Sequence, residues 1–230
     1  MNIIQSSNHP IIQATNSYNA RKVHTDLNWE NAWPLKSFIY PWSAEIPPEL
    51  TFRALWDEMR FYFRFDAEAT DILTYVNTNY KMEVVHSDRV EIFFRSDEKL
   101  DPYYCLEMDP LGRVLDYRTR YYRQFEYDWQ WPGTGQLEVK AAMTGSGYCV
   151  EGSITLQSLK QLNLLQNNEL QAGLFRGECL KLPDPGSSFT WISWVRPESQ
   201  HPDFHIPSAF GTIKLVTGDS QINNHRLFEQ

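Results

Sequence analysis

Hydrophobic and polar residues alternate along much of the chain, a pattern typical of β-strands that bury one face. In RFYFRF (60–65), Phe61, Phe63 and Phe65 share one face and the residues between them share the other. The same alternation predicts further strands in YYCLEM (103–108), QLEVKAAM (136–143), YCVEGSITL (148–156), TWISWV (190–195) and GTIKLV (211–216).

The segment RVEIFFRS (89–96) is the most informative of these strands. Its apolar face begins at Val90, and the opposite face carries Glu91, Phe93 and Arg95. A carboxylate beside an arginine and a ring can hydrogen-bond the hydroxyls of a sugar and contact its C–H face. The segment therefore indicates either a binding face or an ordinary exposed strand with an ion pair.

Turn residues separate the predicted strands, in SDEKLDP (96–102), DPLG (109–112), WPGTG (131–135), LPDPGSS (182–188) and RPESQHP (196–202). Only LQSLKQLNLL (156–165) has helical spacing of its leucines. Many short strands joined by turns predict an all-β protein. We expect an antiparallel two-sheet β-sandwich, of jelly-roll or immunoglobulin-like topology, with one short helix.

The length and the polarity of the chain suggest one domain over residues 1–230, with its core at about 28–216 and a polar tail at 217–230. The 8 tryptophans and 12 tyrosines exceed what a core needs, so some flat rings should be exposed to bind sugars or bases. A net charge of −8 would repel a phosphate backbone, which argues against nucleic acid as the partner.

A local run of arginines and aromatic residues, DYRTRYYRQFEYDWQW (116–131), is interpreted as a solvated ribbon rather than as a nucleic-acid site. The N-terminal region has no basic start followed by an apolar run, and no segment is long enough to span a membrane. The expected molecule is soluble. It would be cytoplasmic as written, or secreted or periplasmic if an export signal is missing; its oligomeric state stays open.

Two groups of residues could bind a metal ion. His201, Asp203 and His205 alternate and could share one face of an extended loop, although a purely structural loop is the simpler interpretation. Calcium could bind loop carboxylates, of which the candidates are Asp97, Glu98 and Asp101. No metal ligand is assigned, and a structural calcium remains possible.

Paired carboxylates raise the alternative of glycoside hydrolysis, which needs two of them about 5–10 Å apart. Asp88 and Glu91 are an odd number of positions apart, so one strand would point them to opposite faces. Glu91 and Glu107 could lie side by side on adjacent strands. A hydrolase that uses this pair is therefore the second hypothesis.

Several segments together resemble family-nine carbohydrate-binding modules. The similar segments are FRALWDEMRFYFRFDAE (52–68), HSDRVEIFF (86–94), GYCVEGSITLQSL (147–159) and ISWVRPESQHPDFHIPSAFGTIKL (192–215). The resemblance implies an antiparallel β-sandwich without catalysis that binds a sugar or the end of an oligosaccharide, of xylan or glucan type. It also implies frequent association with xylanases, and a structural calcium in some members.

The resemblance assigns a ligand-binding role to Glu91 and matches Asp88 to a family aspartate. Family members clamp the terminal sugar between two tryptophans, whose positions fall here at Val85 or His86 and at Phe204. We therefore expect Phe204 as one ring, with His205 as its polar neighbour. The second ring would come from Trp42, Trp129 or Trp131.

A third hypothesis is a haem-binding electron carrier, because related sandwiches in a broader superfamily hold haem. It would need axial ligands, for which His86 and the methionines Met59, Met82 and Met108 are available. Methionines in a core are the more ordinary explanation.

Overall fold

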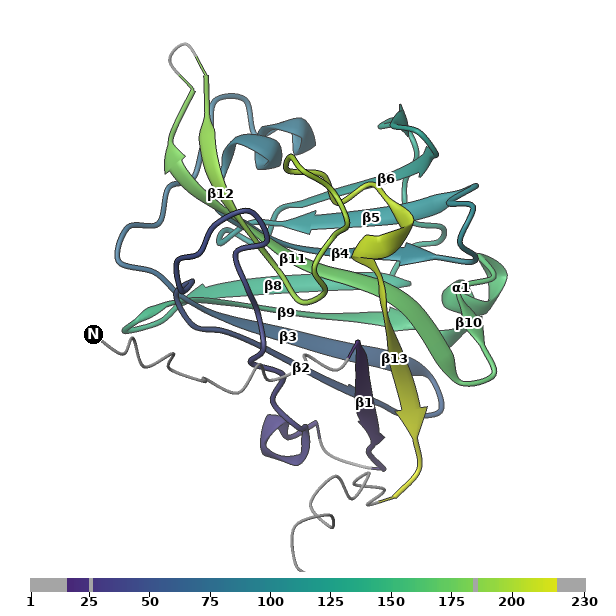
Figure 1. Cartoon of the computed structure of the whole chain (residues 1–230). Helices are drawn as coiled ribbons and strands as arrows, with labels where there is room; N and C mark the ends of the chain where they lie inside the picture. Colours follow the sequence, from purple (N-terminus) through teal and green to yellow (C-terminus); the bar gives the residue numbers. More distant parts are fainter. Residues whose placement is uncertain (1–15, 25–26, 184–185, 219–230) are drawn as a thin grey trace, which may run out of the picture.

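The computed structural model describes residues 16–24, 27–183 and 186–218 (Figure 1). The strands in these ranges are β1 (Ser17–Lys22), β2 (Leu50–Trp56), β3 (Arg60–Glu68), β4 (Arg89–Arg95), β5 (Tyr103–Met108), β6 (Val114–Arg120), β7 (Gln124–Glu126), β8 (Leu137–Met143), β9 (Gly147–Thr155), β10 (Leu165–Gln166), β11 (Glu169–Lys181), β12 (Ser188–Ser193) and β13 (Gly211–Val216). The helices are α1 (Leu156–Gln161) and the 3-10 turns η1 (Trp29–Asn31), η2 (Lys81–His86) and η3 (Pro207–Ala209). No helix in the described ranges has the length and apolar character needed to cross a membrane.

The strands form one continuous hydrogen-bonded sheet, whose main path runs β7-β6-β5-β4-β11-β13-β1-β2-β3-β9-β8. This sheet is mixed, because β1 pairs in parallel with both β13 and β2. The all-β class is confirmed, but the purely antiparallel two-sheet sandwich is wrong. Alternation along a strand indicates which face is buried; it does not indicate which distant strand lies beside it or in which direction that strand runs.

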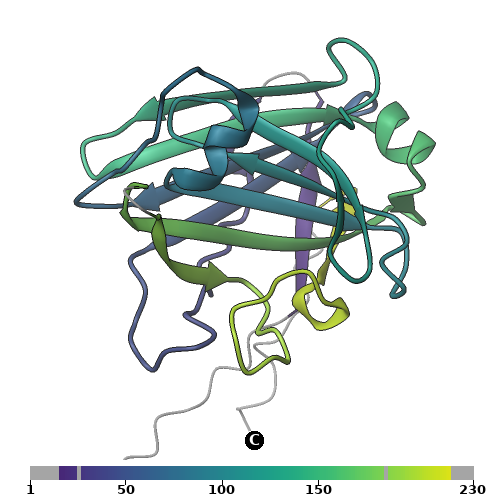
Figure 2. The same cartoon turned by 90° about the horizontal axis from the view of Figure 1, so that it is seen from above.

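The sheet curls strongly, so that strands far apart in its order enclose one main core (Figures 1 and 2). Phe61, Phe63 and Phe65 of β3 are fully buried there together with Val90 and other residues of β4. The alternation of RFYFRF therefore predicted the buried face of β3 correctly.

The segments predicted from alternation correspond to β3, β4, β5, β8, β9, β12 and β13, and α1 lies at the start of the predicted helix. The long strand β11 was missed. Its burial pattern explains why, since Ala172 to Cys179 are buried on both faces except at Glu178. A strand covered on both sides has no polar face and so loses its period of two.

The arginine-rich ribbon of β6 and β7 is neutralised by carboxylates. Arg118 and Arg120 both pair with Glu126, and Arg120 also contacts Asp101. The ribbon thus presents paired charges rather than a basic patch.

Candidate functional site

The side of β4 that faces away from the main core is covered by a second hydrophobic cluster. Arg89, Glu91 and Phe93 lie on this side because they alternate with Val90 and Ile92, which face the main core. Every residue of β4 is consequently buried. The polar residues of this strand sit under a covering layer and not on an open surface.

The connection between β12 and β13 forms that covering layer. Phe204 stacks on Phe175 of β11, with ring centroids 4.0 Å apart and an interplanar angle of 11°. His205 stacks on Phe93 at 5.1 Å, and its Nδ1 lies 2.9 Å from the hydroxyl of Tyr103. Stacking on both strands fixes this connection over the sheet.

Asp203 ties the same connection to the turn between β6 and β7. Its Oδ1 accepts from Arg123 Nη1 at 3.0 Å and from the backbone N–H of His205 at 2.9 Å. Its Oδ2 accepts from the hydroxyl of Tyr122 at 2.7 Å. The loop is therefore held from two sides.

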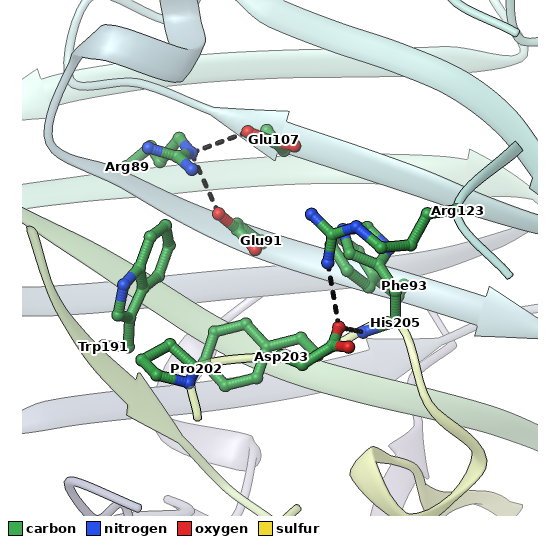
Figure 3. A pocket seen from close by; sticks show the side chains of 10 residues that line it. Arg89, Glu91, Phe93, Glu107, Arg123, Trp191, Pro202, Asp203 and His205 are labelled. Carbon is green, nitrogen blue, oxygen red and sulfur yellow. Dashed lines mark hydrogen bonds and ion pairs between the residues drawn. The ribbon is translucent and has the colours of Figure 1, made fainter. Parts of the chain in front are cut away.

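A cavity of about 430 Å³, its open mouth included, remains between β4 and the connection (Figure 3). The side chains around it are mixed in character, with charged and aromatic residues from the strands and from the loops. They are Arg89, Glu91, Phe93, Glu107, Arg123, Trp191, Pro202, Asp203, Phe204 and His205.

At the floor of the cavity, two carboxylates contact the same guanidinium. Glu91 and Glu107 are directly opposite each other on β4 and β5, and Arg89 Nε lies 2.9 Å from Glu91 Oε1 and 2.6 Å from Glu107 Oε2 (Figure 3). Both contacts are ion pairs by distance, yet these three buried atoms form no well-aligned hydrogen bond with any described residue. These atoms are therefore held by one another through charge rather than through well-aligned hydrogen bonds.

Burial and charge set the protonation states in the cavity. Burial, with a smaller contribution from the charge of Glu107, raises the pKa of Glu91 to about 8, although Arg89 opposes the rise. Burial, reinforced by Arg123, lowers the pKa of His205 to about 3. At neutral pH, His205 is therefore an uncharged imidazole, and burial favours the protonated form of Glu91.

An aromatic wall adjoins the charged floor. The Arg89 guanidinium carbon lies 5.2 Å from the ring centroid of Trp191 and 4.9 Å from that of Phe189. Gly177 lies between Arg89 and Trp191 in the sheet register, and a Cβ there would come within 3.0 Å of the indole. The missing side chain lets the cation and the ring meet across β11.

Comparison with known proteins identifies the family. The model of the family described as "Carbohydrate family 9 binding domain-like" matches residues 22–218. The chain belongs to this family. No protein of curated function matches the sequence.

Solved structures agree with the assignment. A candidate carbohydrate-binding protein from Bacteroides uniformis superposes with a TM-score of 0.64 at 17% identity, over 87% of this chain and 99% of its own. A family-nine module from Caldicellulosiruptor kristjanssonii in complex with glucose superposes with a TM-score of 0.51 at 19% identity, over 90% of this chain and 99% of its own. A family-nine module from that organism in complex with cellotriose superposes with a TM-score of 0.50 at 18% identity, over 93% of this chain and 100% of its own. At these identities the similarity shows a shared fold.

The structure brings several of the residues singled out in the sequence to this cavity: Glu91, Phe93, Glu107, Phe204 and His205. Asp88 lies outside it, because its carboxylate faces the main core and accepts from Tyr148 and Arg176. Arg95 is also outside, since it donates to the carbonyl of Pro207 and covers the ring of Phe210.

The tryptophans expected to complete a family-nine clamp lie elsewhere. Trp131 is buried in the main core, where its indole donates to Ser158, and Trp129 packs beside it. Trp42 contacts Phe204 at 5.4 Å but does not line the cavity. Trp191 lines it instead, at 85° to Phe204, so these two rings are perpendicular rather than facing each other.

The sequence analysis missed Arg89, Trp191 and the role of Asp203 with Arg123. A signal existed for Arg89, because it is two positions from Glu91 and therefore shares its face. A partial signal existed for Trp191, because Trp194 is fully buried in the core and an odd spacing turns Trp191 the other way. The pairing of Asp203 with Arg123 joins two distant loops, and no local pattern indicates it.

The other hypotheses gain no site. Among the described residues, no group of three His, Cys, Asp or Glu side chains is arranged to hold a metal ion. Of the proposed haem ligands, Met108 is buried in the main core, Met59 is exposed, and His86 contacts Ser187. None of the methionines lines the cavity.

Proposed function

We propose that the cavity binds one sugar unit, at the end of an oligosaccharide, without catalysing a reaction. The observation that carries this proposal is the buried floor of Arg89, Glu91 and Glu107 beside the ring of Trp191. Carboxylate and guanidinium groups can hydrogen-bond the hydroxyls of a sugar, and an indole can pack against the C–H face of a pyranose.

The enclosure of the cavity favours a terminal unit over the middle of a chain. The floor is closed by β4 and β5, Pro202 and Asp203 lie across one side (Figure 3), and Phe204 also lines the cavity. A polysaccharide running through such a site would need an exit on both sides. The relatives from Caldicellulosiruptor kristjanssonii in complex with glucose and cellotriose support a glucan-type ligand, and xylan is the neighbouring candidate.

Calorimetry with glucose, cellotriose and xylotriose tests the proposal. We expect dissociation constants from micromolar to millimolar, about −8 to −4 kcal/mol. Trp191→Ala removes the platform and Glu107→Gln removes a charged acceptor, so each should weaken binding at least about tenfold. Trp29→Ala, outside the cavity, is the matched control and should bind as the parent does.

The outcome that contradicts the proposal is normal binding by both cavity variants. Phe204→Ala is a poor probe, because Phe204 is 6% exposed and supports the covering layer through Phe175. Its loss should cost about 3–5 kcal/mol of stability, so reduced binding would report on folding.

Hydrolysis by Glu91 and Glu107 is the second candidate, favoured by the raised pKa of Glu91, which suits a general acid. The geometry argues against it. Both carboxylates contact the same nitrogen of Arg89, so a glycosidic bond between them would have to displace the guanidinium. Incubation of the same oligosaccharides with the protein should release no reducing sugar.

A further inference from the structure

A groove separate from the cavity lies on the outer face of β3, β9 and β8, which are side by side in the sheet (Figure 1). Because Phe61 and Phe63 of β3 face the main core, Tyr62 between them faces outward. In the sheet register Tyr62 is beside Ser153 of β9, and Ser153 is beside Glu138 of β8. These last three residues form a row across the outer face, and all of them line the groove.

Leu27 and Trp29, from the segment before β2, line the same groove. Its volume is about 750 Å³ with the open space above it included, against about 430 Å³ for the cavity with its mouth. The described residues that line the groove are different from those that line the cavity. The groove is therefore a second, independent hollow.

We propose that this groove binds an internal stretch of a polysaccharide, as a second carbohydrate site besides the cavity that takes a chain end. The class of ligand rests in part on the proposed function. The residues that would bind it are separate, so the two sites can be tested one at a time.

Two aromatic rings support a carbohydrate ligand in the groove. The hydroxyl of Tyr62 donates to Asp57 Oδ2 at 2.8 Å, which fixes this ring on the sheet. Trp29 is partly exposed, and its indole N–H donates to no described residue. An indole with a free N–H can pack against the C–H face of a pyranose and hydrogen-bond one of its hydroxyls.

The charged side chains at the groove favour a neutral ligand, because each of them has an opposite partner. Lys140 Nζ lies 2.8 Å from Glu151 Oε2, and Arg60 Nη2 lies 3.6 Å from Glu138 Oε2. The side chains of Lys140 and Glu138 are 78% and 66% exposed, so their remaining donors and acceptors can reach hydroxyl groups. Paired charges give no net field that would attract an anionic polymer or a basic peptide.

The groove is open where the cavity is enclosed. Leu27 in its lining is 45% exposed, whereas Glu91, Glu107 and Phe204 of the cavity are buried. A linear chain can lie along an open groove without ending in it. Because an open groove makes fewer contacts with each sugar unit, short oligosaccharides should occupy the cavity and long chains should occupy the groove.

Affinity electrophoresis through gels that contain β-glucan or xylan, as long or as partly hydrolysed chains at equal mass, tests the proposal. Binding to chain ends increases with the number of ends, whereas binding to internal units depends on mass alone. Trp191→Ala, impaired in the cavity, should still be retarded, and equally by both chain lengths. Trp29→Ala should bind long chains at least about tenfold more weakly than the parent. It should keep trisaccharide binding in calorimetry, since Trp29 lies outside the cavity.

Tyr80→Ala, which removes a 56% exposed ring outside both sites, is the matched control and should behave as the parent does. Thermal unfolding checks that each variant is folded. If folded Trp29→Ala is retarded by long chains as strongly as the parent, or if Trp191→Ala is not retarded, the groove proposal is overturned. Trisaccharide binding still decides the cavity in either case. A parent that is dimeric, with a monomeric Trp29→Ala variant of unchanged retardation, would assign the groove to contact between copies of the chain and would also overturn the proposal.

Discussion

Two buried charge clusters lie on opposite sides of the paired strands β4 and β11, and they differ in how completely they are satisfied. On the main-core side, Arg176 Nε and Nη2 lie 3.2 and 3.3 Å from the two oxygens of Asp88, and Nη1 donates to the carbonyl of Glu68 at 2.7 Å. The hydroxyl of Tyr148 donates to Asp88 at 2.6 Å. Here both oxygens of the buried carboxylate are hydrogen-bonded, and a second, partly exposed carboxylate, Glu178, lies 4.0 Å from Arg176 Nη2.

On the cavity side, Arg89 serves both Glu91 and Glu107, and the shared contacts are close but poorly aligned. Burial is almost the same in the two clusters, with Arg176 at 0% and Arg89 at 5% exposure. The difference therefore lies in the alignment of the hydrogen bonds and in the burial of the second carboxylate, since Glu107 is buried and Glu178 is partly exposed. The well-aligned cluster supports the fold, and the cluster beside the cavity is the one that the proposed sugar would meet.

The largest expected effect breaks the satisfied cluster. Asp88→Ala leaves the guanidinium of Arg176 buried without its carboxylate, which should lower the free energy of unfolding by about 3–5 kcal/mol. Urea unfolding measures this loss, and sugar binding per folded molecule should not change. Asp66→Ala, which removes a half-exposed partner of Arg53 and Arg64, is the control and should cost at most about 1 kcal/mol.

A loss below about 1 kcal/mol for Asp88→Ala would show that the Arg176 cluster is not structural in this sense, and the contrast between the two clusters would disappear. Weaker sugar binding by the fully folded Asp88→Ala variant would also contradict this contrast, because Asp88 would then affect the cavity.

The sequence predicted one half of this comparison. Period-two alternation placed Glu91 and Phe93 on one face of a strand, and the structure puts both at the cavity with Glu107 directly opposite. The same alternation separated Asp88 from Glu91 and so kept the two clusters apart. Local patterns are enough to predict which residues lie together when those residues are on one strand or on two adjacent strands.

The rest depends on long-range register. Trp191 reaches Arg89 only because β12 and β4 pair with the two edges of β11 and because Gly177 stands between them. β11 itself has no alternation to reveal it. The assignment of ring partners to Trp129 and Trp131 failed for the same reason, since their place in the main core is set by tertiary packing.

A smaller expected effect is a change of the free energy of unfolding with pH. It should come from Glu91, in the cluster on the cavity side. Its folded pKa of about 8 lies above the usual range, so the folded state keeps a proton that the unfolded state releases. The contribution of Glu91 to the free energy of unfolding should therefore be largest below about pH 4.5. This contribution should fall as the pH rises to about 8. The slope is at most about 1.4 kcal/mol per pH unit.

Urea unfolding at pH 5, 6.5 and 8 measures this dependence in the parent and in Glu91→Gln. The variant should lose much less stability over this interval, because its amide does not titrate. Asp97→Asn, in an exposed turn, serves as a control and should follow the parent. Parallel pH profiles for the parent and Glu91→Gln would mean that Glu91 is ionised throughout this interval in the folded protein and that burial does not raise its pKa.

The smallest effect sharpens the geometry of the cavity side. In Gly177→Ala, the new Cβ would lie 3.0 Å from the Trp191 indole and 3.1 Å from Arg89 Nη1, so both side chains must shift by a few tenths of an ångström. Both can move, so the cost in stability should be near the low end for overpacking, about 1 kcal/mol. Sugar binding should weaken by less than about tenfold, since the floor and the wall are displaced but present.

Gly145→Ala, with open space around the new methyl group, should change neither property. Unaltered binding by Gly177→Ala would show that Arg89 and Trp191 do not need this contact, and the aromatic wall would then act on the ligand independently of the charged floor.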